Sequence, residues 1–297
     1  MRHRRQLESC PTLFDGYLAV DWSANNKPKR GADSIWIAAC GWGGFSEPRN
    51  PATRMKAMAC IEALIKSATR EGKRLLCGFD FPFGYPASSA RMLTGRDGWE
   101  AVWSRIAELV EDGPDNTNNR FEAAAKLNAA FDGDGPFWGH GLKHDIPGLP
   151  RKKPTWGEHL PPNRRHAECE VRKAQEVWKL FYPGSVGGQA LTGIAALERL
   201  RHRTGAKIWP FETLGEGGTH VLAEIYPSLV EPAPGPEVKD ARQVRAVAAA
   251  LERLDVQGTL AWHLRAPQNL PSTVRTEEAT ILGMQDPKSF QAAAEGP

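Results

Sequence analysis

The sequence predicts an α/β domain built on a mixed β-sheet. Residues 17–22 and 34–40 are two apolar strands separated by a polar turn, which is the spacing of a hairpin. A helix predicted over residues 51–71 then leads to a continuous apolar run at 74–79. An antiparallel hairpin followed by a helical crossover implies a mixed sheet with helices packed on it.

The first half of the chain supplies the clearest of these elements. The first strand ends on a carboxylate, Asp21, and a weak third strand is predicted over residues 44–47, where glycines lower its propensity. In the helix at 51–71, apolar side chains recur at helical spacing and Gly72 is a suitable C-cap. The run at 74–79 lacks alternation, as expected of a strand inside a sheet, and is followed by a second carboxylate, Asp80.

The stretch from about residue 88 to 204 has a different character and is predicted to be a helical and loop insertion into the sheet domain. Residues 132–165 are rich in Gly, Pro and charge and are predicted to be a long loop, which in a compact domain is usually functional or disordered. Helices are predicted over 88–111, 119–131, 167–180 and 190–204.

The sheet is predicted to resume at residues 207–212 and 220–226. A strongly amphipathic helix follows at 236–255, and a short one at 276–284. We therefore expect residues 1–15 to form a flexible N-terminal arm and residues 16–297 to form one domain.

Composition is that of an ordinary globular protein. The 297 residues carry a net charge of +3, with 41% hydrophobic and 25% charged residues, so charge alone indicates no partner. No apolar run approaches the ~18 residues needed to cross a bilayer, so no membrane partner is expected. The five cysteines form no C-x-x-C pair, which favours reduced thiols and a cytoplasmic location.

Four acidic residues form a candidate metal site. Asp21, Asp80 and Glu224 occur in or at the end of apolar strand runs, where an isolated charge is costly unless it is paired or holds a metal. Asp240 is expected in the first turn of the 236–255 helix, on the face toward the sheet. Carboxylates converging from several elements suit Mg²⁺. The alternative is that the two aspartates cap turns and that Asp240 only complements the helix dipole.

Further candidates would contact a substrate. Residues 184–193 are rich in glycine and precede or open a helix, so Gly184, Ser185, Gly187 and Gly188 are predicted to approach a phosphate group. A tight packing turn is the alternative, because the stretch lacks the Gly-Lys-Ser/Thr ending of a P-loop. Ser23 follows Asp21 directly and is expected to reach a bound phosphate; Arg120 either faces the same cleft or begins a surface helix.

Basic residues cluster at 151–153 and 164–165, with Trp138 and Trp156 between them. Basic side chains interleaved with aromatic rings are typical of surfaces that grip a nucleic-acid backbone and stack bases. A solvated loop is the alternative interpretation.

Four segments carry a resemblance to a known family. They are residues 19–24 (AVDWSA), 78–84 (GFDFPFG), 184–193 (GSVGGQALTG) and 223–228 (AEIYPS). They resemble a bacterial family of predicted nucleases with an RNase H-like fold, and the resemblance runs from about residue 16 to 284.

The resemblance implies an RNase H-like mixed sheet whose first three strands are antiparallel. Asp21 would match the acid of the family's first strand and Asp80 that of its fourth. The two would bind Mg²⁺ or Mn²⁺ for phosphodiester hydrolysis of DNA or RNA. Glu224, Asp240 or Glu212 would supply the last acid, and the sequence does not decide between them.

Three functions follow as hypotheses. The first is a metal-dependent nuclease or phosphodiesterase. The second is an ATP-binding phosphotransfer protein of the related actin-like fold, although such proteins usually contain two such domains. The third is a non-catalytic RNase H-like scaffold or binding protein, which the modest net charge favours over a nuclease for long duplexes.

Overall fold

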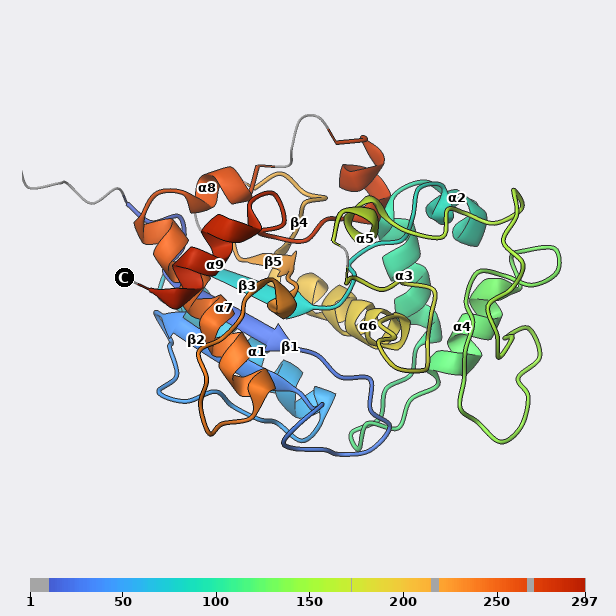
Figure 1. The fold of residues 1–297 in the computed structure, drawn as a ribbon, viewed down its shortest axis with the longest axis horizontal. Coiled ribbons are helices and arrows are strands. Elements are labelled where there is room, and N and C mark those ends of the chain that lie inside the picture. The colour runs from blue at the N-terminus through green and yellow to red at the C-terminus, as the bar shows by residue number, and fades with distance from the viewer. Residues whose placement is uncertain (1–10, 172, 215–218, 266–269, 297) are drawn as a thin grey trace, which may run out of the picture.

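The computed structural model describes residues 11–171, 173–214, 219–265 and 270–296. Within them lies a five-stranded sheet of order β2-β1-β3-β5-β4 (Figure 1). The strands are β1 (Gly16–Asp21), β2 (Trp36–Gly41), β3 (Leu75–Asp80), β4 (Lys207–Trp209) and β5 (Val221–Glu224). The predicted α/β class and mixed sheet are therefore confirmed.

One strand of the expected order is missing from the described residues. β2 is antiparallel to β1, and β3, predicted at 74–79 as the fourth strand, is parallel to β1. The third antiparallel strand expected at 44–47 is not among the strands of the described residues. In place of the strand expected at 44–47, the N–H groups of Gly44 and Phe45 donate to the carbonyls of Gly41 and Ala39, and Arg49 forms a single bridge with Ile37. Gly43 has a φ of 72° and Pro48 has no N–H to donate, so this segment cannot form a regular ladder.

Helices cover both faces of the sheet and give the fold three layers. On one face lie α1 (Arg54–Arg70), α3 (Trp99–Leu109) and α6 (Gly187–Thr204), in one core with Leu18, Val20 and Phe79. On the other face, α7 (Lys239–Val256) packs on β1 and β2, and α9 (Pro287–Glu295) packs on α7 (Figure 1). Tyr17 and Ala19 belong to this second core, as period-2 alternation along β1 requires.

The predicted insertion contains α2 (Ser89–Thr94), α3, α4 (Arg120–Asn128), α5 (His166–Glu170) and α6. The single helix expected over 88–111 is divided, because Gly95 and Gly98 have φ values of 70° and 87°. The helix expected over 167–180 ends at Glu170. Beyond it, backbone bonds from Trp138 to Trp178 (3.2 Å) and from Leu180 to Trp138 (2.9 Å) hold the chain extended.

The described part of the expected N-terminal arm is anchored. The N–H groups of Leu13 and Phe14 each donate to the Asp255 carboxylate over 2.9 Å, and Phe14 is buried in the second core. Residues 1–10 lie outside the described residues, so the structure bears only on the end of the arm. Its anchor, Asp255, lies more than 200 residues away in the sequence.

The C-terminal end differs from the sequence prediction in its details. The helix expected at 276–284 is a single π-helical turn, Val274–Glu278, followed by turns. Two short helices that were not predicted, α8 (Leu260–His263) and α9, pack beside α7. In the described ranges, no helix is long and apolar enough to cross a membrane.

Candidate functional site

Asp21 and Asp80 lie side by side at the ends of two neighbouring parallel strands. The register of β1 and β3 pairs Asp21 with Asp80. Register partners in a sheet direct their side chains to the same face. Alternation places both carboxylates on the face of Tyr17 and Leu76, which is the face that α7 covers. The structure thus brings these two predicted acids together at one edge of the sheet.

Asp240 lies near the same end of the sheet, at the start of α7. It is in the first turn of α7, where a carboxylate complements the helix dipole, and it accepts a 2.8 Å hydrogen bond from the Asp33 N–H. Its negative charge also raises the pKa of both Asp21 and Asp80. Asp240 therefore acts electrostatically on the strand aspartates, as expected of a member of one acidic cluster.

The carboxyl groups of Asp21 and Asp80 hold protons more tightly than ordinary aspartates. Burial, followed by the charges of Asp80, Asp240 and Asp33, raises the pKa of Asp21 well above its usual range. Burial, followed by the charges of Glu224 and Asp240, raises the pKa of Asp80 to about 7. Such a site is stabilised either by a proton or by a bound cation.

Glu224 belongs to a different set of interactions. The register pairs it with Phe79, so its side chain leaves the sheet on the face opposite to that of Asp80. There its carboxylate accepts hydrogen bonds from both terminal nitrogens of Arg165, at 2.7 and 2.8 Å, and from the Phe83 N–H at 2.8 Å. The guanidinium also pairs with Glu168 at 2.8 Å. The expected role of Glu224 as a metal ligand is not supported, because its carboxylate is already occupied.

Glu212, the other alternative for the last acid, is also used locally. It accepts 2.8 Å hydrogen bonds from the Lys207 ammonium and from the Ile208 N–H. Of the three alternatives, Asp240 is the one that lines the cavity beside Asp21.

The donor chemistry of the aspartate pair fits a hard divalent cation. Mg²⁺ and Mn²⁺ take oxygen ligands, and one or two protein carboxylates commonly suffice when substrate phosphate and water complete the shell. Over the described ranges, no three His, Cys, Asp or Glu side chains form a complete ligand set. Asp21 and Asp80, with Asp240 beside them, are the residues that would hold such an ion.

A cavity of about 480 Å³ opens beside Asp21. It is lined by six of the residues that the sequence singled out: Asp21, Ser23, Arg120, Ser185, Gly188 and Asp240. Its walls come from the loop after β1, from the start of α4, from the start of α6 and from the start of α7. The cavity thus has acidic groups from the sheet side and one guanidinium from the insertion.

The glycine-rich stretch has two roles. A Cβ on Gly187 would lie 2.3 Å from the Val177 carbonyl oxygen, and one on Gly193 would lie 2.4 Å from the Phe81 ring, so these two glycines allow close packing. Gly184 has a φ of 75° in the preceding turn. Of the predicted glycines, only Gly188 is among the residues that line the cavity, whereas Gly187 and Gly193 fit the alternative of a tight packing turn.

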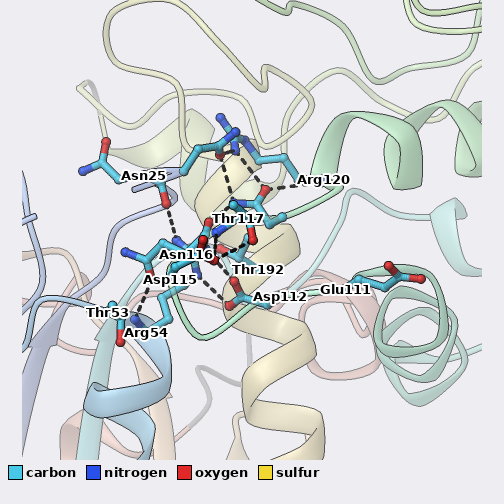
Figure 2. A network of polar contacts seen from close by, with 12 residues as sticks. Asn25, Thr53, Arg54, Glu111, Asp112, Asp115, Asn116, Thr117, Arg120 and Thr192 are labelled. Atoms are coloured by element: carbon cyan, nitrogen blue, oxygen red, sulfur yellow. Dashed lines mark hydrogen bonds and ion pairs between the residues drawn. The ribbon is translucent and has the colours of Figure 1, made fainter. Parts of the chain in front are cut away.

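The loop after β1 is held by a residue that sequence reasoning missed. Arg54, buried at the start of α1, donates to the carbonyls of Ser23 (2.9 Å) and Asn25 (2.8 Å) and pairs with Asp112 at 2.6 and 2.7 Å. It also donates to the Asn116 carbonyl (Figure 2). The sequence shows only an arginine near the start of a predicted helix, and the partners that give Arg54 its role lie far away in the sequence.

The start of α6 fixes the other side of the same loop. The Gln189 amide donates to the Trp22 carbonyl over 2.9 Å, and the Trp22 ring nitrogen donates to the Thr192 hydroxyl over 3.2 Å. The Ser23 hydroxyl accepts a 2.8 Å bond from the Asn25 side chain. Ser23 therefore lines the cavity on a loop held from both sides.

The predicted basic surface is largely neutralised within the molecule. Arg151 pairs with Asp145 at 2.7 Å, and Lys153 pairs with Glu176 at 2.6 Å. Arg164 donates to two backbone carbonyls, and Arg165 is the buried partner of Glu224. These contacts favour a structural role for the basic cluster over nucleic-acid binding.

Comparison of the chain with protein-family models, with curated proteins and with solved structures found no match.

Proposed function

We propose that this protein is a divalent-metal-dependent phosphodiesterase of the nuclease type, with Mg²⁺ or Mn²⁺ held by Asp21 and Asp80. The observation that carries the proposal is the register pairing of these two aspartates, beside a cavity that Asp21 lines. Their raised pKa values indicate negative charge that no side chain in the described structure neutralises, and a divalent cation would supply that balance.

We also propose an RNase H-like arrangement for the sheet. Three features support it: the antiparallel β1–β2 pair, the parallel β3 beside β1, and the acids at the ends of β1 and β3. The backbone bridge of Arg49 to Ile37, on the side of β2 away from β1, lies where a third antiparallel strand would run. Residues 88–204 would then be an elaboration of that core.

The acidic residues and Arg120 would have different roles in the reaction. A bound ion supplies an activated water and stabilises the leaving oxygen when it is present. Asp21 and Asp80 hold charge at the sheet edge, and Asp240 tunes their proton affinity from the start of α7. Arg120 faces the cavity from α4 and would orient the phosphate.

Calorimetric titration with Mn²⁺ and Mg²⁺ tests the proposal directly. The native protein is expected to bind the ion and to hydrolyse a simple phosphodiester such as bis(4-nitrophenyl) phosphate. Asp21→Asn should abolish both while leaving the fold intact. Asp134→Asn, in an exposed part of the insertion, is the matched control and should change neither. If the native protein binds no ion, with or without a phosphodiester present, the nuclease proposal is wrong and the scaffold hypothesis is favoured.

A further inference from the structure

Arg120 is a buried cation without a counter-ion. Its side chain is 9% exposed, and its guanidinium bonds only to the amide oxygens of Asn26 and Asn118, the latter at 2.9 Å. Its Nε has no hydrogen-bond partner, and no ion pair of the described residues includes it. Burial, with the nearby charge of Arg54, lowers the pKa of Arg120 to about 10.

The other buried arginines differ in this respect. Arg54 pairs with Asp112, and Arg165 pairs with both Glu168 and Glu224. Figure 2 shows Arg54 and Arg120 at opposite ends of one polar network, in which the carboxylate of Asp112 bonds to Arg54 alone. An unpaired buried charge is costly, so a position that keeps one indicates an anion supplied from outside the chain.

The start of α6 adds a second group of donors at the same place. α6 has 18 residues, and its N-cap, Val186, provides no side-chain acceptor. The Gly187 N–H donates to the Lys179 carbonyl, but no acceptor in the described structure bonds to the N–H groups of Gly188 and Gln189. A Cβ on Gly188 would lie 3.1 Å from Arg120 Nε, so the guanidinium and the helix terminus are neighbours. Free N–H groups at a helix start attract phosphate.

We propose that Arg120 and the N-terminus of α6 bind one phosphate group of a nucleotide-sized ligand, in the cavity that Asp21 and Asp240 also line. Ser185 also lines this side of the cavity and supplies a hydroxyl. Among the described residues, Arg120 is the one cation without an ion pair that lines the cavity. The cavity volume of about 480 Å³ suits a small ligand, so an extended polynucleotide is not favoured.

An aromatic side chain completes the recognition site. Phe181 lines the same cavity and is 40% exposed, which is unusual for a large apolar ring in this chain. Such a ring offers a face on which a nucleobase can stack. The ligand class is therefore a nucleoside monophosphate, free or at the phosphorylated end of a short strand. The assignment of this ligand as a substrate rests on the proposed function, whereas its binding does not.

Titration in the absence of metal tests ligand binding at Arg120 separately from any metal-dependent reaction. Inorganic phosphate, AMP and a short oligonucleotide with and without a 5′-phosphate are added in turn to the native protein. Phosphate and AMP should bind, AMP more tightly, and the phosphorylated oligonucleotide should bind at least tenfold more tightly than its unphosphorylated form. The logarithm of affinity should fall with the logarithm of salt with a slope of about one or less, as for a single phosphate contact.

Two variants identify the subsite. Arg120→Gln should weaken AMP binding about tenfold or more, whereas Arg91→Gln, at an exposed pair with Asp97, should not. Asn26→Asp is nearly isosteric and places a carboxylate on Arg120. It should raise the unfolding midpoint while weakening AMP binding, which a loss of folding cannot mimic.

Different results would contradict the phosphate subsite at Arg120 and the metal site at Asp21. Equal AMP affinity of the native protein and Asn26→Asp, or no AMP binding at all, would overturn the subsite. Equal binding of both oligonucleotides with a steep salt dependence would overturn the single-phosphate assignment and indicate an extended strand. Asp21→Asn should retain AMP binding in the absence of metal, so loss of metal binding alone would leave the subsite standing.

Discussion

Asp21 and Asp80 are register partners on parallel strands, so their carboxylates share one face of the sheet at its open end. Neither has a basic partner among the described side chains, and the charge of Asp80 raises the pKa of Asp21. Asp21 and Arg120 line the same cavity. These charges without ion-pair partners among the described residues lead to the predictions below.

Asp80→Asn should stabilise the metal-free protein at alkaline pH. The pKa of Asp80 rises from an ordinary 3.8 to about 7 on folding, so the folded state binds the proton more tightly. The stability that this proton contributes is complete below about pH 4 and is lost as the pH rises through about 7. At pH 8 with a chelator, the free energy of unfolding of Asp80→Asn should therefore be about 1–3 kcal/mol higher than that of the native protein.

Urea denaturation across pH 4–8 measures this difference, which should shrink as the pH falls. Asp134→Asn changes an exposed aspartate and serves as the control. If Asp80→Asn were less stable than the native protein at pH 8, the raised pKa of Asp80 would be wrong.

Glu224→Gln should unfold the protein more readily than Asp21→Asn does. Glu224 is bonded to both terminal nitrogens of a fully buried Arg165, and removal of its charge leaves that guanidinium with Glu168 alone. Loss of one partner of a buried pair costs about 3–5 kcal/mol. Thermal unfolding of both variants gives the comparison. A stable Glu224→Gln protein that had lost metal binding would instead restore Glu224 as a ligand.

Arg54→Lys should destabilise the protein and loosen the loop that carries Ser23. A lysine keeps the charge but cannot reproduce the two-pronged contact with Asp112 together with the bonds to the Ser23 and Asn25 carbonyls. We expect a loss of about 2–4 kcal/mol in the free energy of unfolding.

Faster amide hydrogen exchange at residues 23–26 should accompany the loss of stability in Arg54→Lys. The control is Arg203→Lys, at an exposed pair with Glu62, which should cost less than about 1 kcal/mol. Equal effects of the two substitutions would contradict the role given to Arg54.

Asp255→Asn should release the segment before β1. The Asp255 carboxylate accepts hydrogen bonds from the N–H groups of Leu13 and Phe14 and from the Tyr17 hydroxyl at 2.6 Å. An amide offers one acceptor oxygen for these donors, so a loss of about 2–3 kcal/mol is expected in denaturant titrations. Glu252→Gln, one turn earlier on α7, is the control and should have little effect.

The sequence predicted the layers of the fold better than the pairing of its strands. Each strand run and the long helices were visible because hydrophobic periodicity is local. The position of Glu224 was not visible. Whether it shares a face with Asp80 depends on the register of β5 against β3, and nothing near residue 224 specifies that register.

Long-range contacts also explain the other errors. The segment after Glu170 has enough helix formers for a helix, but its backbone bonds to Trp138 instead. The cavity shows the same limit, because Arg120 was a candidate from its position alone. That it lacks a carboxylate partner becomes visible only when the loops at Asn26 and Asn118 are brought to it.

The insertion between β3 and β4 supplies Arg120, Phe181 and Gly188, whereas the sheet and α7 supply the acidic residues. The cavity is therefore assembled from two separate parts of the chain. Substitutions at Arg120 or Phe181 are expected to alter one wall of the cavity while the register of β1 and β3 keeps Asp21 beside Asp80.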